Sequence, residues 1–250
     1  MTTLELETVA FDAWPAAEVV IRDGWRLRYN HGVTRRANSV WPNHLDSAAD
    51  VDELMQQVER FYRARHAPVR YQISPAMQPA DLDQRLAERG YEAVSHTAVQ
   101  IAALSRVCAS PRTAEGVDVI LSDEVDDAWF SAYCRAEQLS GPSAETRRAI
   151  LERIPPATAF ARAIIEGEII AVGSGVAANG WLGLFNMTTL TAFRRRGVGR
   201  ALVNSLAAWA IEEGMTCAYL QVMVDNLPAL RLYASAGFAT RYEYHYRESG

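Results

Sequence analysis

Residues 184–199 have the sequence LFNMTTLTAFRRRGVG, and this stretch decides the fold. It begins as an apolar, strand-like run and continues into three arginines, Gly197 and Gly199. Apolar residues from Val198 to Trp209 then recur at the spacing of an α-helix. Glycines let the backbone approach a ligand, and a helix N-terminus presents free N–H groups and the positive end of its dipole. The stretch therefore predicts a strand, a loop that binds an anion such as pyrophosphate, and a helix.

Two other interpretations of this loop compete with anion binding. A run of arginines is commonly just a solvated face of a protein. A dinucleotide-binding loop would need a third glycine, where Leu202 stands, and parallel strands around it. Here the preceding runs are joined at Glu166-Gly167 and Asn179-Gly180, which are typical of tight antiparallel hairpins.

Outward from the loop, hydrophobic periodicity predicts an ordered series of strands and helices. In the second half we expect strands at 117–121, 158–165, 169–176, 181–189, 217–224 and 238–247, and helices at 124–139, 144–154, from 198 to before Gly214, and at 227–235. In the first half we expect strands at 18–22, 25–29, 36–41, 69–73 and 91–101, and helices at 51–65 and 79–89. This order predicts an α/β fold of the α+β kind, with a mixed sheet.

The two halves resemble each other, which indicates an internal duplication. Residues 86–91 (LAERGY) match residues 233–238 (YASAGF) as a helix end, a glycine and an aromatic residue that starts a strand. We therefore expect an N-terminal domain at 1–104, a linker at 105–116 and a C-terminal domain at 117–250. The first copy has PNHLD at 42–46 where the second has its arginines and glycines, so only the second is expected to bind a phosphorylated ligand.

Composition excludes several classes of protein. The chain has 250 residues and a net charge of −5, and all 25 of its basic residues are arginine. Without lysine, Schiff-base chemistry, pyridoxal enzymes and lysine-dependent phosphate loops are excluded, and the negative charge argues against non-specific nucleic-acid binding. The isolated Cys108, Cys134 and Cys217 predict neither a disulfide framework nor a metal site. With no secretory signal and no apolar run of about 20 residues, we expect a cytoplasmic monomer or homodimer away from membranes.

Four segments together resemble the GNAT acyl-CoA N-acetyltransferase superfamily: 184–189, 194–199, 225–226 and 232–238. The resemblance is to a tandem type with a degenerate first copy, and it implies acetyl-CoA as cosubstrate. It also implies that the pantetheine arm enters where the fourth and fifth strands of the second copy splay apart. By position, it assigns cofactor binding to Met187, Thr188, Thr189, Arg194, Arg195, Arg196, Gly197, Val198, Gly199, Arg200, Asn226 and Tyr233.

Acetyl transfer needs an uncharged amine, a polarised carbonyl and a proton for the leaving thiolate. The resemblance implies that Tyr233 supplies this proton, although a tyrosine beside Gly237 could also be a packing residue. Many relatives carry a glutamate base where this chain has Gln221, whose amide cannot accept a proton. The substitute bases left open are Glu243, His245, Glu137 and a water.

The sequence leaves the acceptor open. The tandem layout resembles N-acetylglutamate synthase-like proteins, which favours a small-molecule amine, with an amino acid as one candidate. Either Arg35-Arg36 or Arg147-Arg148 could receive its carboxylate. The run Leu184–Asn186 also resembles N-terminal acetyltransferases of proteins, and Gln221 keeps open a non-catalytic acyl-CoA sensor.

Overall fold

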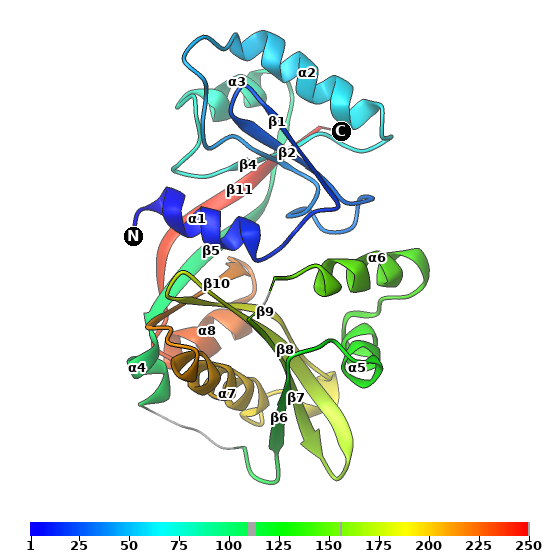
Figure 1. Cartoon of the computed structure of the whole chain (residues 1–250), viewed down its shortest axis with the longest axis vertical. Helices are drawn as coiled ribbons and strands as arrows, with labels where there is room; N and C mark the ends of the chain where they lie inside the picture. Colours follow the sequence, from blue (N-terminus) through cyan, green and yellow to red (C-terminus); the bar gives the residue numbers. More distant parts are fainter. Residues whose placement is uncertain (110–113, 156, 250) are drawn as a thin grey trace.

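A computed structural model describes residues 1–109, 114–155 and 157–249, in which one mixed sheet runs through the molecule with helices on its faces (Figure 1). The strands of this described part are β1 (Glu18–Arg22), β2 (Trp25–Tyr29), β3 (Val40–Trp41), β4 (Arg70–Ile73), β5 (Glu92–Ala103), β6 (Asp118–Ser122), β7 (Thr158–Ile165), β8 (Glu168–Ala178), β9 (Trp181–Thr189), β10 (Cys217–Met223) and β11 (Ala239–Glu248). Their order across the sheet is β1-β2-β3-β4-β11-β5-β10-β9-β8-β7-β6.

The helices of the described residues are α1 (Thr3–Asp12), α2 (Val51–Arg63), α3 (Leu82–Glu88), α4 (Leu104–Cys108), α5 (Asp127–Glu137), α6 (Gly141–Glu152), α7 (Val198–Glu212) and α8 (Leu227–Ser235). In the second half they cover both faces of the sheet. On β7, Ala159 and Ala161 pack in the core under α4, α7 and α8, while Phe160 packs in the core under α1, α5 and α6. A third core lies between α2, α3 and strands β2 to β4. No helix in the described ranges has the length and apolar character needed to cross a bilayer.

The two halves exchange their last strands. The last strand of the first half, β5, pairs with β10 from Cys217↔Ala103 to Met223↔Thr97. The last strand of the second half, β11, pairs with β4 of the first, with His245 opposite Ile73. Because β5 and β11 also pair with each other, the sheets of the two halves join into one.

Strands β9 and β10 separate partway along their length. Their parallel pairing runs from Cys217↔Trp181 to Leu220↔Leu184, and no register pair joins the described residues beyond it. At the same level β9 bulges against β8, and Asn186 adopts a left-handed φ of 54°. The edge of Asn186–Thr189 that faces β10 is therefore without a strand partner in the described chain, as the resemblance implied.

Most predicted elements are confirmed, and the differences have local causes. The strand expected at 36–41 is wrong except for Val40–Trp41, because the side chain of Asn38 binds the backbone of Asn30, Gly32, Val33 and Thr34 and folds 30–38 into a compact loop. The segment expected as a linker begins with α4, whose Leu104 and Val107 are buried. Helix α1 was not predicted from the sequence, although Thr2 and Glu5 form a capping box at its start.

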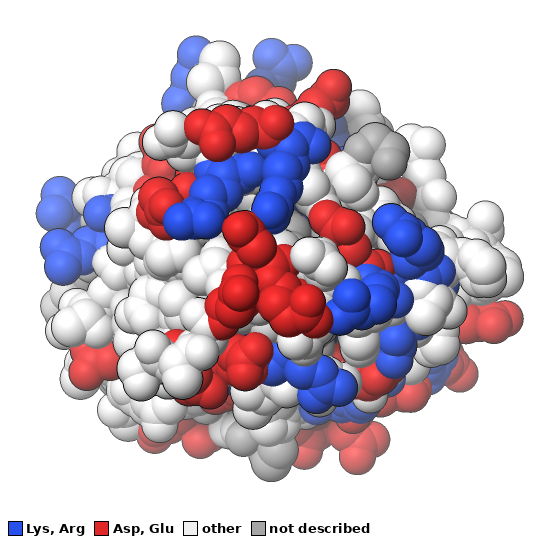
Figure 2. All heavy atoms as spheres, turned by 90° about the horizontal axis from the view of Figure 1, so that it is seen from above, with Lys and Arg blue, Asp and Glu red and all other residues white. Residues whose placement is uncertain are grey.

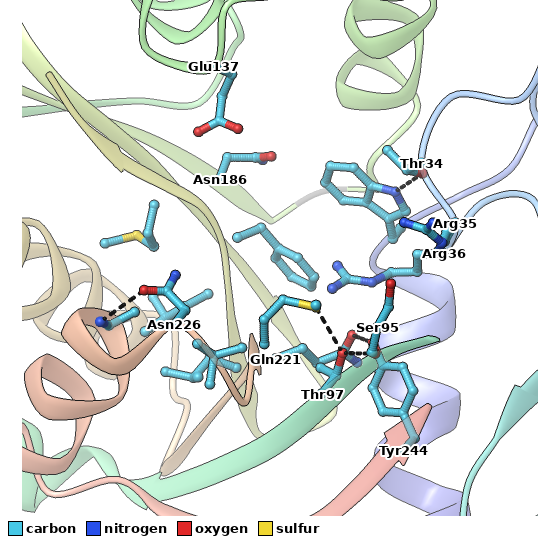
Figure 3. A pocket seen from close by; sticks show the side chains of 18 of the residues that line it. Thr34, Arg35, Arg36, Ser95, Thr97, Glu137, Asn186, Gln221, Asn226 and Tyr244 are labelled. Atoms are coloured by element: carbon cyan, nitrogen blue, oxygen red, sulfur yellow. Dashed lines mark hydrogen bonds between the residues drawn. The ribbon is translucent and has the colours of Figure 1, made fainter. Parts of the chain in front are cut away.

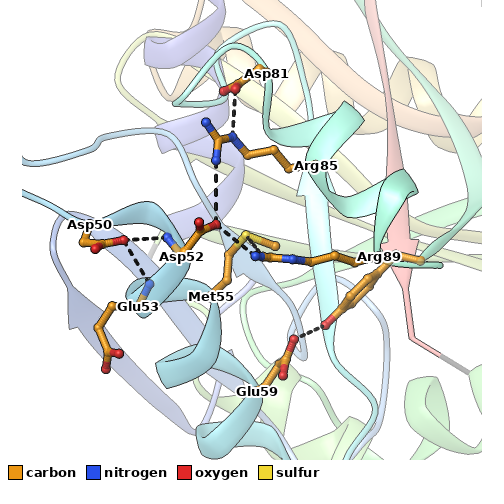
Figure 4. A network of polar contacts seen from close by, with 9 residues as sticks. Asp50, Asp52, Glu53, Met55, Glu59, Asp81, Arg85 and Arg89 are labelled. Atoms are coloured by element: carbon orange, nitrogen blue, oxygen red, sulfur yellow. Dashed lines mark hydrogen bonds and ion pairs between the residues drawn. The ribbon is translucent and has the colours of Figure 1, made fainter.

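The end of the molecule formed by α2 and α3 carries charges of both signs. Arg85 bonds Asp81 at 2.7 Å and lies 3.7 Å from Asp52, which also accepts a bond from Arg89 at 2.9 Å (Figure 4). Seen from above, acidic and basic side chains alternate across this face (Figure 2). Such interleaving gives the face no strong field of a single sign.

Candidate active site

The splay between β9 and β10 opens into a cleft of about 650 Å³. Met187, Gln221, Asn226 and Tyr233 line it, all of which the sequence analysis had selected. The first half also contributes to its wall, through Trp14 after α1, Thr34 to Arg36 in the loop after β2, and Ser95 and Thr97 on β5. The exchanged strand β11 adds Tyr244 and Tyr246. The cleft is thus built by both halves.

The N-terminus of α7 is open to an anion. Its N-cap is Gly197 in the left-handed conformation (φ 84°), without a side-chain cap and without an acidic residue in the first turn. A glycine adopts this conformation without strain, and the first N–H groups of the helix stay available to a ligand. The corresponding helix of the first half, α2, is closed instead, because Asp50 accepts the N–H groups of Asp52 and Glu53. This contrast fits a phosphate site in the second half.

The arginines around this loop have different roles. The side chain of Arg194 braces the loop by donating to the carbonyl of Thr189 at 3.1 Å, and Arg195 is exposed. The guanidinium of Arg196 lies over the ring of Phe193. Arg200 is buried and bonds Asn204 and Ser235, so its side chain joins α7 to α8.

Gly199 is needed for packing between α7 and α8. A Cβ atom at this position would lie 3.1 Å from the Cδ2 atom of Leu232 on α8. The second glycine of the loop therefore lets α8 approach α7 closely, which positions the residue that follows Leu232.

That residue is Tyr233, which is 7% exposed and packs edge-on against Phe238. Burial raises the pKa of Tyr233 to about 12, so its hydroxyl keeps its proton at neutral pH. At the start of α8, the Oδ1 atom of Asn226 caps the helix by accepting the N–H of Ala229. Its amide NH₂ group then supplies the remaining donors toward the cleft.

Gln221 lies on β10, and its Oε1 atom accepts a hydrogen bond of 2.9 Å from the hydroxyl of Tyr244. It also lines a smaller cavity behind the cleft, together with Glu7. Glu7 is buried and accepts a bond of 2.8 Å from Nε1 of Trp41. Burial raises the pKa of Glu7 despite hydrogen bonds that lower it.

The three side chains considered as bases lie in different places relative to the cleft. The Nε2 atom of His245 lies 3.0 Å from Asp83 of α3, and its ring stacks on His96 outside the cleft lining. Burial lowers the pKa of His245. Glu243 is exposed and is not part of the lining either. Of the three side chains considered, Glu137 at the end of α5 lines the cleft, where it extends toward Asn186 (Figure 3).

Several cleft residues were missed by the sequence analysis because they come from distant segments. The ring of Trp14 stacks on Phe185 of β9 with centroids 5.7 Å apart, and its Nε1 atom bonds Thr34. Tyr133 of α5 receives a hydrogen bond of 2.8 Å from Arg147 of α6. The capping box before α1 was the one sequence signal near Trp14 that could have placed it after a helix.

Comparisons with known proteins decide the family. The family model described as "Probable histone acetyltransferase Rv0428c C-terminal" matches residues 3–247. The chain belongs to this family. It is 33% identical over 247 residues to the "Uncharacterized N-acetyltransferase YobR" of Bacillus subtilis, covering 97% of each chain. It is also 28% identical to the "Probable histone acetyltransferase Rv0428c" of Mycobacterium tuberculosis, over 87% of this chain and 65% of that protein.

Solved structures agree with this acetyltransferase fold. A GCN5-related N-acetyltransferase from Kribbella flavida matches with a TM-score of 0.73 and 17% identity, covering 99% of this chain and 93% of that one. A tandem GNAT protein from the clavulanic acid biosynthesis pathway matches with a TM-score of 0.65 and 12% identity, over 84% and 74%. The acetyltransferase is therefore a GNAT enzyme with a mixed sheet, and acetyl-CoA is its cosubstrate.

Proposed function

We propose that the acetyltransferase transfers the acetyl group of acetyl-CoA to the primary amine of a small molecule, by direct attack in a ternary complex. The observation that carries this proposal is the cleft at the β9–β10 splay. It adjoins the free edge of β9 on one side and is lined by Trp14, residues 34–36 and β11 on the other. A small acceptor can be enclosed there beside the thioester.

The residues of this chain fit acetyl-CoA. The free edge of Met187–Thr189 can pair with the amides of the pantetheine arm as an added strand would, and Asn226 can donate to the same arm. The backbone from Arg194 to Gly199 and the open end of α7 can hold the pyrophosphate. A backbone N–H of β9 is suited to polarise the acetyl carbonyl.

The reaction forms one bond and breaks one. The uncharged amine nitrogen attacks the carbonyl carbon, the carbon–sulfur bond then breaks, and the sulfur leaves as a thiolate. Tyr233, protonated and facing the cleft, donates to this sulfur. The proton lost by the amine passes to water or to Glu137, since the amide of Gln221 cannot take it.

A protein amine is the second candidate acceptor, because the matched family and the Mycobacterium relative are described as probable histone acetyltransferases. A peptide chain needs an open groove. Here Trp14 stacks on Phe185 across the cleft, and Arg36 lies within 6 Å of both rings, which favours a compact acceptor.

The test measures release of free CoA thiol against amino acids, polyamines, aminoglycosides, and short peptides that include lysine-rich tails. We expect turnover with a small amine, and we expect Tyr233→Phe to lower kcat by roughly 10²–10⁴-fold while the affinity for acetyl-CoA stays unchanged. Tyr71→Phe is the matched control, because Tyr71 is a buried tyrosine in the core of the first half.

Each alternative has its own outcome. Turnover with peptides alone would replace the proposed acceptor class. Binding of acetyl-CoA without thiol release for any amine would indicate a sensor. Unchanged kcat in Tyr233→Phe would remove Tyr233 from the mechanism.

A further inference from the structure

Two guanidinium groups from different halves of the chain converge on one aromatic ring in the cleft. Arg36 comes from the loop of the first half, and Arg147 comes from α6 of the second half. The Cζ atom of each lies 5.6 Å from the centroid of Trp14. Both side chains line the cleft (Figure 3 labels Arg36).

Both arginines have buried polar atoms without partners. The Nε atoms of Arg36 and Arg147 are shielded from solvent and make no hydrogen bond to the described residues. Arg147 donates one bond to the hydroxyl of Tyr133, which is neutral. For Arg36 the described contacts are with the rings of Trp14 and Phe185. Buried donors without an acceptor cost free energy. Because both residues also line the cleft, their guanidinium groups can offer donors to a ligand bound there.

The charges lining the cleft are unbalanced. Among the described lining residues, the charged side chains are Arg35, Arg36, Arg147 and Glu137. Arg35 forms an ion pair of 3.0 Å with Glu248, a carboxylate that Arg70 also contacts at 2.8 Å. Among the described residues, Arg36 and Arg147 form no ion pair with a carboxylate, and Glu137 extends toward Asn186 (Figure 3). The cleft therefore presents two positive charges to an acceptor.

We propose that the acceptor of the acetyltransferase carries a carboxylate beside its primary amine, and that Arg36 and Arg147 together bind this carboxylate. This inference rests on the proposed function. Guanidinium groups match the planar carboxylate with paired N–H donors. The opposite ends of the acceptor are then recognised separately, with its carboxylate near Trp14 and its amine toward the splay.

The inference also distinguishes classes of acceptor. A lysine-rich peptide would bring its cationic side chains toward two guanidinium groups that have no ion pair in the described chain, and like charges repel. The phosphates of CoA have their own site at the open end of α7, so they do not account for the two arginines. An amino acid or a longer amino carboxylate satisfies both the charge and the enclosed shape.

The test compares acceptors in matched pairs: L-amino acids, β-alanine and 4-aminobutanoate, each with its primary carboxamide. For the wild-type enzyme we expect kcat/KM to be at least tenfold higher for the carboxylate of the best pair. Arg36→Gln and Arg147→Gln should each raise KM for that carboxylate by roughly 10- to 100-fold. Neither variant should change KM for acetyl-CoA or kcat/KM for the carboxamide, and Arg36→Lys should recover part of the loss.

Arg148→Gln is the matched control. Arg148 follows Arg147 on α6, but it is bonded to Asp127 and Glu152 away from the cleft. This variant should keep the wild-type preference. Thermal unfolding of every variant, and calorimetry of the N-acetylated product binding in the presence of CoA, separate lost recognition from lost folding.

Two results would overturn the inference. One is a wild-type enzyme that acetylates small amines with no preference for the carboxylate of any pair. The other is an equal loss for carboxylate and carboxamide in the Gln variants, which would assign the arginines a structural role. A wild-type enzyme that acetylates only peptides, or nothing, would instead refute the proposed function.

Discussion

Cutting the chain between its halves should abolish the folding of each half by itself. In a fragment of residues 114–250, the exchanged strand β5 is missing. The fragment therefore loses the seven register pairs between β5 and β10 and the eight between β5 and β11. An antiparallel ladder has on average one backbone hydrogen bond per pair, and each bond contributes about 1 kcal/mol net. The loss of roughly 15 kcal/mol is as large as the whole stability of a typical domain, about 5–15 kcal/mol.

The assay uses residues 1–109 and 114–250, expressed separately and together. Each alone should lack a cooperative thermal transition by circular dichroism and should release no CoA thiol. The two together should form a 1:1 complex on gel filtration, with a transition and activity close to those of the intact chain. If residues 114–250 alone unfold cooperatively and turn over acetyl-CoA, the strand exchange is not what stabilises the catalytic half.

Two further predictions concern residues near the cleft. Since burial raises the pKa of Glu7, the folded protein holds this proton more tightly than the unfolded chain, so stability should fall as pH rises above the ordinary value of 4.5. In Glu7→Gln the melting temperature should decline less between pH 5 and pH 8 than in the wild type; parallel curves would contradict this. Gly199→Val should cost about 1–3 kcal/mol of unfolding free energy and lower turnover, because its side chain would displace Leu232. Ala208→Val, on the exposed side of the same helix, should do neither, and equal losses in both would exclude the packing role of Gly199.

Local features of the fold could be predicted from the sequence, because they depend on neighbouring residues. The hairpin turn at Asn179-Gly180 fixes the ends of β8 and β9, and the positions of Gly197 and Gly237 mark a helix start and a helix end. In both halves the helix before the last strand ends with the same turn, in which Gly90 and Gly237 adopt left-handed conformations. These signals act within a few residues, so one sequence is enough to detect them.

The strand exchange could not be predicted, because alternation of side chains defines the faces of a strand and not its neighbours. Both β5 and β11 follow a helix and a glycine, so the sequence fits pairing within a half as well as between halves. For the same reason, the sequence could not predict which residues of the two halves meet in the cleft. Arg147 is more than one hundred positions from Trp14 and Arg36 in the sequence, and the shared sheet brings the three residues together.

The helices α2 and α7 differ in how their N-termini are capped, and this difference bears on where a phosphate can bind. In α7 the cap is a left-handed glycine, which leaves N–H groups for an external anion. In α2 the cap is Asp50, whose carboxylate takes two of those N–H groups and adds negative charge where a phosphate would have to sit. This cap disfavours a phosphate at the N-terminus of α2, while the loop of the first half contributes Arg36 to the cleft. Because the exchanged strands hold the two halves in one sheet, the pairing that stabilises the fold also places that loop in the wall of the cleft.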